Sequence, residues 1–193
     1  MKKGFTIIEL FIVMAIISIL SSVVFLNWKH GEQLFALQNS AYKLCQDIRE
    51  MQEMTMSANV CTECGNVVPL RYGIYSDGDD SNLYQLSAEI NNDDGLFFPS
   101  APGSDDILIK TMEYEDDIYL KSIVWDGCSP KGPKKVHLTF APPDPKTEIW
   151  IGRPDHPVHA PVQCSKVTLN LCIGTSGEIK SVIINQSGLV YVE

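Results

Sequence analysis

The stretch that decides the fold is FTIIELFIVMAIISILSSVVFL, residues 5–26, an apolar run that contains one acidic residue, Glu9. As an α-helix these 22 residues would be about 33 Å long, enough to cross the roughly 30 Å hydrocarbon layer of a bilayer. Lys2 and Lys3 come directly before the run, and basic residues favour the cytoplasmic side of a membrane. The sequence therefore predicts one membrane-spanning helix over residues 5–26, with the rest of the chain outside the cytoplasm.

This segment differs from an ordinary secretory signal. No small-residue A-x-A cleavage site follows the apolar run, which is also longer than a signal-peptide core. A carboxylate within a membrane is costly, so Glu9 predicts a functional role. A plain membrane anchor explains the length of the segment and leaves Gly4 and Glu9 unexplained.

The order KKGFTIIE, residues 2–9, resembles the cleavage and assembly motif of type IV prepilins and type II secretion pseudopilins. The resemblance implies that a membrane peptidase cuts after Gly4, so that residues 1–4 form a leader and the mature chain begins at Phe5. It also implies methylation of the new N-terminus at Phe5 and retention of the apolar helix. In a filament Glu9 would neutralise the N-terminal amine of a neighbouring subunit, because such a pair compensates two charges in a low dielectric.

Residues 27–58 are expected to continue the helix as an amphipathic half, which gives one helix over residues 5–58. Apolar residues recur at the three-four spacing of a helix that is buried on one side. They are Leu34, Leu37, Ala41, Leu44, Ile48 and Met51. The opposite, polar face is expected to carry Gln38, Lys43, Asp47, Arg49, Glu50 and Gln52.

From residue 59 the spacing becomes alternating, which predicts a β-rich head over residues 59–193. VVPLRYGIYS (67–76) and NLYQLSAEI (82–90) are expected to form a hairpin around a turn at Asp77-Gly78. Further strands are expected at residues 107–112, 118–125, 135–140, 147–151, 166–173, 178–185 and 189–192. The predicted fold class is α+β: a long N-terminal helix whose second half packs on an antiparallel, sandwich-like β head.

Residues 135–193 are similar, in the order of their strands and turns, to the head of the minor pseudopilin H family of type II secretion, which is shared with fimbrial T-type minor pilins. Those heads are antiparallel β-sandwiches that end in a strand, a glycine turn and a last strand, as in IINQSGLVYVE, residues 183–193. Members of this family that bind DNA carry basic residues around the final turn. Residues 186–193 contain no Lys or Arg, so we expect no DNA binding.

The charge of the chain also argues against nucleic acid as a partner. The net charge is −9, and removal of Lys2 and Lys3 with the leader would leave 13 basic against 24 acidic residues. Phosphate contacts require clustered Lys and Arg. Acidity of this kind keeps an exported head soluble and does not point to a ligand.

Six cysteines are many for a cytosolic domain of this length, and an even number in an exported head favours disulfides. The candidate disulfide cysteines are Cys45, Cys61, Cys64, Cys128, Cys164 and Cys172. The sequence does not choose among the possible pairings. Cys45 lies near the apolar face of the helix, so it is either a buried thiol or a link between helix and sheet.

Two metal sites are conceivable, and we favour neither. Cys61 and Cys64 have the spacing of half a zinc site, with His156 and His159 as the other half. The two-residue gap between the histidines is short for zinc, and the surrounding prolines indicate a loop.

An acidic turn at residues 77–82 has the oxygen-rich composition of a calcium loop. Ala88 stands at the position where such a loop has its twelfth, acidic residue, so a solvated hairpin turn is the simpler interpretation. No catalytic signature is present, and we expect no enzyme activity, cofactor or metal.

The sequence thus predicts a structural filament subunit, a minor pseudopilin of a type II secretion system assembled at or near the tip of the pseudopilus. The resemblance implies three partners: other pseudopilin or pilin subunits, the prepilin peptidase and the inner-membrane assembly platform. It implies a single-pass protein of the bacterial inner membrane with a periplasmic head. The alternatives are a minor type IV pilin of a surface pilus and an exported binding or enzymatic domain on a plain anchor.

Overall fold

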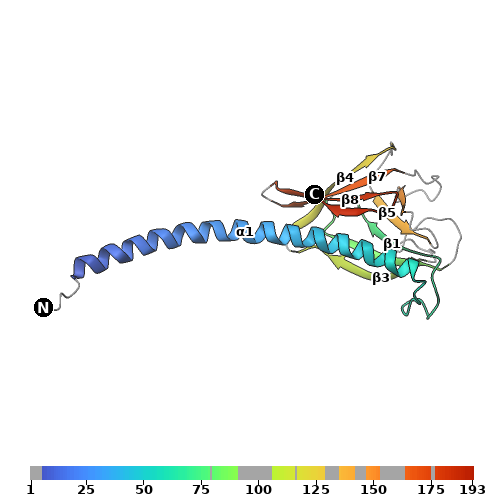
Figure 1. The fold of residues 1–193 in the computed structure, drawn as a ribbon, viewed down its shortest axis with the longest axis horizontal. Helices are drawn as coiled ribbons and strands as arrows, with labels where there is room; N and C mark the ends of the chain where they lie inside the picture. The colour runs from blue at the N-terminus through green and yellow to red at the C-terminus, as the bar shows by residue number, and fades with distance from the viewer. Residues whose placement is uncertain are drawn as a thin grey trace. The chain divides into compact units, whose positions relative to one another are not determined.

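The computed structural model describes residues 6–78, 80–90, 106–115, 117–128, 135–141, 147–152, 164–174 and 177–193. The chain divides into two compact units, Met1–Ala36 and Leu37–Glu193. Helix α1 (Ile7–Met56) begins in the first unit and ends in the second, and strands follow it in chain order (Figure 1). The α+β fold class predicted from the sequence is confirmed.

Within the second unit, the part of α1 from Leu37 onward is amphipathic. Five of the six apolar residues expected on its packed side are at most 2% exposed: Leu37, Ala41, Leu44, Ile48 and Met51. The sixth, Leu34, belongs to the first unit and is 37% exposed. The buried face of the helix therefore begins at Leu37, and three-four spacing is the reason that these side chains share one face.

Among the described residues, nine strands form two sheets, and all of their pairings are antiparallel. The first sheet has the order β3-β2-β1-β5-β6, and the second has the order β4-β7-β8-β9. The bounds are β1 Arg71–Ser76, β2 Leu83–Glu89, β3 Asp106–Glu113, β4 Ile118–Asp126, β5 Lys135–Phe140, β6 Thr147–Gly152, β7 Lys166–Ile173, β8 Ile179–Asn185 and β9 Val190–Val192.

The central strands of the first sheet are buried on both faces. From Tyr72 to Ser76 every residue of β1 is buried, and so is every residue of β5 from Val136 to Phe140. A Cβ atom added at Gly73 would lie 2.6 Å from the carbonyl oxygen of Leu138, so β1 and β5 approach closely at a glycine.

Side chains near the end of α1 form hydrogen bonds with the last hairpin of the second sheet. The guanidinium of Arg49 donates a hydrogen bond to the carbonyl oxygen of Val190 in β9 at 2.6 Å. The side-chain amide of Gln52 donates to the carbonyl oxygen of Gly188, in the turn before β9, at 3.0 Å. The bond from Arg49 is charge-assisted and therefore stronger than a neutral one. The short strand β9 is thus bound to the helix as well as to β8.

Strand β1 begins at Arg71, later than the stretch from residue 67 that the sequence predicted. Cys61 and Val67 instead form an isolated antiparallel bridge that closes a turn, and Cys61 is disulfide-bonded to Cys64. Pro69 has no backbone N–H to contribute to a strand ladder. The turn therefore ends before the regular pairing of β1 with β2 begins.

Asp47 was expected on the polar face of the helix, and this expectation is wrong. Asp47 is 9% exposed, and the hydroxyl of Tyr84 in β2 donates a short hydrogen bond to its carboxylate. Burial, together with the hydrogen bond to Asp47, raises the pKa of Tyr84, so the phenol keeps its proton and acts as the donor. The polar residue lies within the packed face because a partner on the sheet satisfies it.

Replacing Tyr84 with Phe should destabilise the head by about 1–3 kcal/mol, because it leaves a buried carboxylate without its donor. Urea unfolding of the full chain in detergent micelles would measure the loss. The matched control is Tyr75→Phe, because the two partners of the Tyr75 hydroxyl, Asp77 and Lys135, also pair with each other and the Asp77 side chain is 58% exposed to water. Equal stability of the two variants would contradict the role assigned to the Asp47–Tyr84 bond.

Candidate membrane and assembly segment

The first unit exposes a long apolar helix surface. Between Ile7 and Phe25 the exposed large apolar side chains range from 47% to 77% of full exposure. The most apolar 18-residue stretch of α1 has a mean hydropathy of 2.7, and the helix is long and apolar enough to cross a membrane. A helix that is apolar on all sides is typical of a membrane span. The anchor predicted from residues 5–26 therefore has its structural counterpart in this part of α1.

Glu9 caps the start of its own helix. The backbone N–H and the hydroxyl of Thr6 each donate a hydrogen bond to Oε2 of Glu9 at 2.8 Å. In return the N–H of Glu9 donates to the Thr6 hydroxyl at 3.4 Å. This reciprocal arrangement is a capping box, which satisfies backbone donors that the first turn leaves without partners.

The capping role of Thr6 is the functional detail that the sequence reasoning missed, although the signal was present. A Thr followed three residues later by Glu, directly before an apolar run, is a known helix-start pattern. The prepilin-like motif predicted roles for Gly4, Phe5 and Glu9 and none for Thr6. In the structure, the two hydrogen bonds from Thr6 fix the orientation of the Glu9 carboxylate.

The cap leaves part of the carboxylate available. Both bonds from Thr6 end on Oε2, and no other described residue donates to Oε1. A carboxylate has about four lone-pair sites, so Glu9 can accept a further donor from outside the chain. Gly4 and Phe5, the residues of the expected cleavage and methylation, lie outside the described residues.

Two serines within the apolar segment bind their own helix. The hydroxyl of Ser18 donates to the carbonyl oxygen of Met14 at 2.8 Å, and that of Ser22 donates to the carbonyl oxygen of Ser18 at 2.9 Å. Within a bilayer such groups must find partners in the protein. These two hydroxyls therefore add no unsatisfied polar group to the membrane-facing surface.

Four of the six cysteines form two disulfides, Cys61–Cys64 and Cys128–Cys164. Cys45 and Cys172 are free, buried thiols, so these two differ from the expected disulfide set. Burial raises the pKa of the Cys45 thiol, although the charge of Arg49 opposes the shift. Of the alternatives left open for Cys45, the structure shows the buried thiol.

Residues of both conceivable metal sites are bonded to other groups of the protein. A disulfide-bonded sulfur is not the thiolate that zinc requires, and Cys61 and Cys64 are bonded to each other. His156 and His159 lie outside the described residues. The carboxylate of Asp77 pairs with the amine of Lys135 and accepts a bond from Tyr75. The part of the chain that the structure describes contains no group of three or more His, Cys, Asp or Glu placed to hold a metal ion.

Comparison with known proteins identifies the N-terminal segment. A family model described as the prokaryotic N-terminal methylation motif matches residues 1–25. No curated protein and no solved structure matches the chain. The chain thus carries a type IV prepilin-like motif over the segment that contains the Thr6–Glu9 cap and most of the exposed apolar surface. The motif supports a pilin-like structural subunit that is anchored in a membrane by this helix.

Proposed function

We propose that the chain is a minor pseudopilin of a type II secretion system, a non-enzymatic subunit incorporated at or near the tip of a periplasmic filament. The observation that carries the proposal is the methylation motif at residues 1–25, which includes most of the exposed apolar part of α1. The β-rich head and the glycine turn before its last strand agree with the family resemblance of residues 135–193. Other pseudopilins, the prepilin peptidase and the inner-membrane assembly platform are the proposed partners.

In this proposal, filament assembly depends on an ion pair between the N-terminal amine of one subunit and the Glu9 carboxylate of its neighbour. Cleavage after Gly4 removes Lys2 and Lys3 and creates an α-amine at Phe5, which the peptidase methylates. In the growing filament this amine binds Glu9 of a neighbouring subunit, whose carboxylate is held in place by Thr6. Pairing compensates both charges in the apolar surroundings. It also sets the axial register of the helices, which apolar contacts alone define poorly.

The proposed division of the chain is a leader over residues 1–4, a helix over residues 5–58 with its membrane span at 5–26, and a periplasmic head over residues 59–193. Disulfides persist in oxidising compartments such as the periplasm, and the head contains two of them. The inner membrane with an outward-facing head is therefore the proposed location.

Mass spectrometry of the mature protein tests the proposal. We expect a chain that begins at Phe5 and carries one additional methyl group on its N-terminus. A Gly4→Val variant should retain residues 1–4, because the peptidase then meets a branched side chain at the cleaved bond. An intact Met1 in the unmodified protein, or cleavage beyond Leu26, would exclude the prepilin mechanism and favour a plain anchor or a removable signal.

A minor type IV pilin is the second candidate, because the methylation motif is common to both kinds of filament. The two differ in where the assembled subunit is found. Recovery of the chain in fibres sheared from the cell surface would favour the pilus. Retention in the periplasm, together with a loss of protein secretion when the chain is deleted, would favour the pseudopilus.

A further inference from the structure

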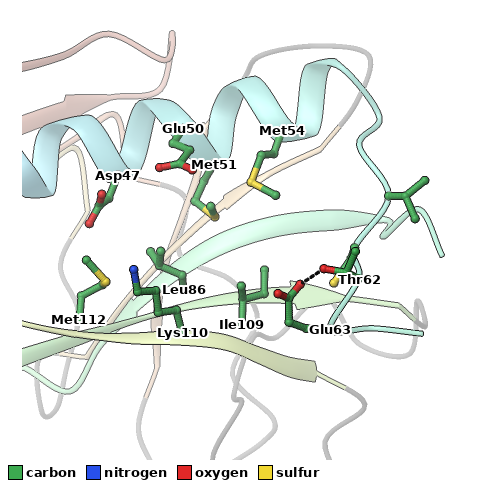
Figure 2. A pocket seen from close by; sticks show the side chains of 12 residues that line it. Asp47, Glu50, Met51, Met54, Thr62, Glu63, Leu86, Ile109, Lys110 and Met112 are labelled. Carbon is green, nitrogen blue, oxygen red and sulfur yellow. Dashed lines mark hydrogen bonds between the residues drawn. The ribbon is translucent and has the colours of Figure 1, made fainter. Parts of the chain in front are cut away.

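A pocket of about 260 Å³ lies within the second unit, between the last turns of α1 and the strands β2 and β3. Figure 2 shows Met51 and Met54 pointing from the helix toward the strands that carry Ile109, Lys110 and Met112. Leu86 of β2 and Ile109 of β3 contribute further apolar surface, and the Cys61–Cys64 turn lines one end. Methionine side chains are flexible and polarisable, so a wall containing three of them adapts to different occupants.

A β-bulge in β3 shapes this pocket. Leu86 pairs with Lys110 and Ser87 pairs with Leu108, so Ile109 is an extra residue without a partner across the β2–β3 ladder. A bulge of this kind redirects side chains that strict alternation would send to opposite faces. Ile109 and Lys110 consequently both line the pocket although they are consecutive in the sequence.

β3 lines the pocket and also forms one edge of the first sheet, in the part of the chain that the structure describes. β3 is the terminal strand of the first sheet, and among the described strands it pairs only with β2. Leu108 on this strand is 42% exposed, and Lys110 and Thr111 are also exposed. An edge strand offers unpaired N–H and C=O groups to which an extended segment of another protein can add as a further strand.

The pocket carries an excess of negative charge. Its lining contains three carboxylates, Asp47, Glu50 and Glu63, against the single amine of Lys110. Asp47 is engaged by Tyr84, whereas Glu50 and Glu63 form no ion pair with any residue that the structure describes. The hydroxyl of Thr62 donates to Glu63 and holds the pKa of that carboxyl below its ordinary value. Glu63 therefore stays charged and available to a cation.

We infer that the pocket and the outer edge of β3 together bind an extended segment of a partner protein in which a Lys or Arg stands between apolar residues. The backbone of the segment pairs with β3, and the basic side chain enters the pocket. Its apolar stem lies against Met51 and Met54 while its charge approaches Glu50 and Glu63. The volume fits one long side chain and is below the roughly 300–1,000 Å³ of typical small-molecule sites. This inference is independent of the proposed filament.

The test uses the full chain in detergent micelles with ¹³C-labelled methionine methyl groups, which NMR observes individually. The probe is the peptide acetyl-Thr-Val-Lys-Val-Thr-amide at millimolar concentration. We expect the signals of Met51, Met54 and Met112 to shift while that of Met14, in the membrane segment, stays unchanged. Glu50→Lys should weaken binding by roughly tenfold or more, since it reverses a charge at the pocket.

Three controls test the position of the negative charge, the charge of the peptide and its backbone pairing with β3. Glu53→Lys changes an exposed carboxylate of the same helix that does not line the pocket, and it should alter binding less than about twofold. A peptide with Glu in place of Lys should not bind, and a peptide N-methylated at its backbone should lose the pairing with β3. The inference is overturned by an absence of methionine shifts, by equal binding of the Glu peptide, or by equal effects of the two Lys substitutions. Full binding of the N-methylated peptide would overturn the strand pairing.

Discussion

Replacing Glu9 with Gln is expected to abolish incorporation of the chain into filaments while α1 still begins at the same residue. Gln retains a side-chain oxygen that can accept the bonds from Thr6, so the capping box persists. The negative charge is lost, and in the proposed filament the α-amine of the neighbouring subunit would be left uncompensated in apolar surroundings. Removing one partner of a buried ion pair costs about 3–5 kcal/mol, which corresponds to more than about a hundredfold in an equilibrium constant.

The matched variant is Thr6→Ala, which removes the cap and leaves the carboxylate. Loss of a capping residue costs about 1 kcal/mol, so assembly should fall by roughly tenfold or less. Quantitative blotting of the filament fraction measures incorporation, and mass spectrometry of each variant checks that the N-terminus is still processed. Normal incorporation of Glu9→Gln would show that the charge is not the assembly contact. A larger defect in Thr6→Ala would assign the main role to the cap.

The strands were predictable because their signals are local. The sequence predicted residues 135–140 and 166–173, and the structure has β5 and β7 with these bounds. Both are rich in branched and apolar residues and have loop residues at their ends. The hairpin turn at Asp77-Gly78 was equally readable, since Gly78 adopts a φ of 101° that favours glycine.

The distribution of strands between the sheets was not predictable. β3 and β4 are neighbours in the sequence, yet β3 belongs to the first sheet and β4 to the second. β1 pairs with β5 across a long stretch of chain that contains β4. Such pairings depend on which surfaces meet in the folded molecule, and a single sequence does not record them.

In the candidate site and the head, too, contacts between residues close in the sequence were predictable, and contacts between distant residues were not. The Thr6–Glu9 cap joins residues three positions apart and was readable from this spacing. The burial of Asp47 was not, because its partner Tyr84 is 37 positions away. The part of α1 from Leu37 onward belongs to the same compact unit as the strands. Periodicity reveals a helix and does not reveal the residue at which its side chains start to contact a distant sheet.

The two disulfides are expected to differ strongly in their contribution to stability. The bridged cysteines are 36 positions apart in Cys128–Cys164 and 3 apart in Cys61–Cys64. The entropy that a cross-link removes from the unfolded chain grows with loop length and corresponds to about 4 kcal/mol for the longer loop and about 2 for the shorter. Substituting both cysteines of the longer loop by Ser should therefore be the more damaging change.

The sheet topology gives a second reason to expect that loss of the Cys128–Cys164 disulfide destabilises the head more than loss of Cys61–Cys64. Cys128 follows β4, and Cys164 precedes β7, its neighbour in the second sheet. Between them the chain contributes β5 and β6 to the first sheet. The Cys128–Cys164 bridge thus fastens the place where the chain leaves one sheet to the place where it returns. The Cys61–Cys64 bridge closes a single turn that a backbone bridge between Cys61 and Val67 also holds.

Urea unfolding of the full chain in detergent micelles would compare the two double Ser variants, Cys128/Cys164 and Cys61/Cys64, with the unmodified protein. A reducing agent should shift the unmodified protein toward the stability of a variant that lacks both bridges. Cys45 and Cys172 provide an internal measure of unfolding, because they are buried and should react with iodoacetamide only when the head opens. Equal losses in the two variants would mean that loop length does not govern their stability. A larger loss in the Cys61/Cys64 variant would instead make the turn after α1 the critical constraint on the head.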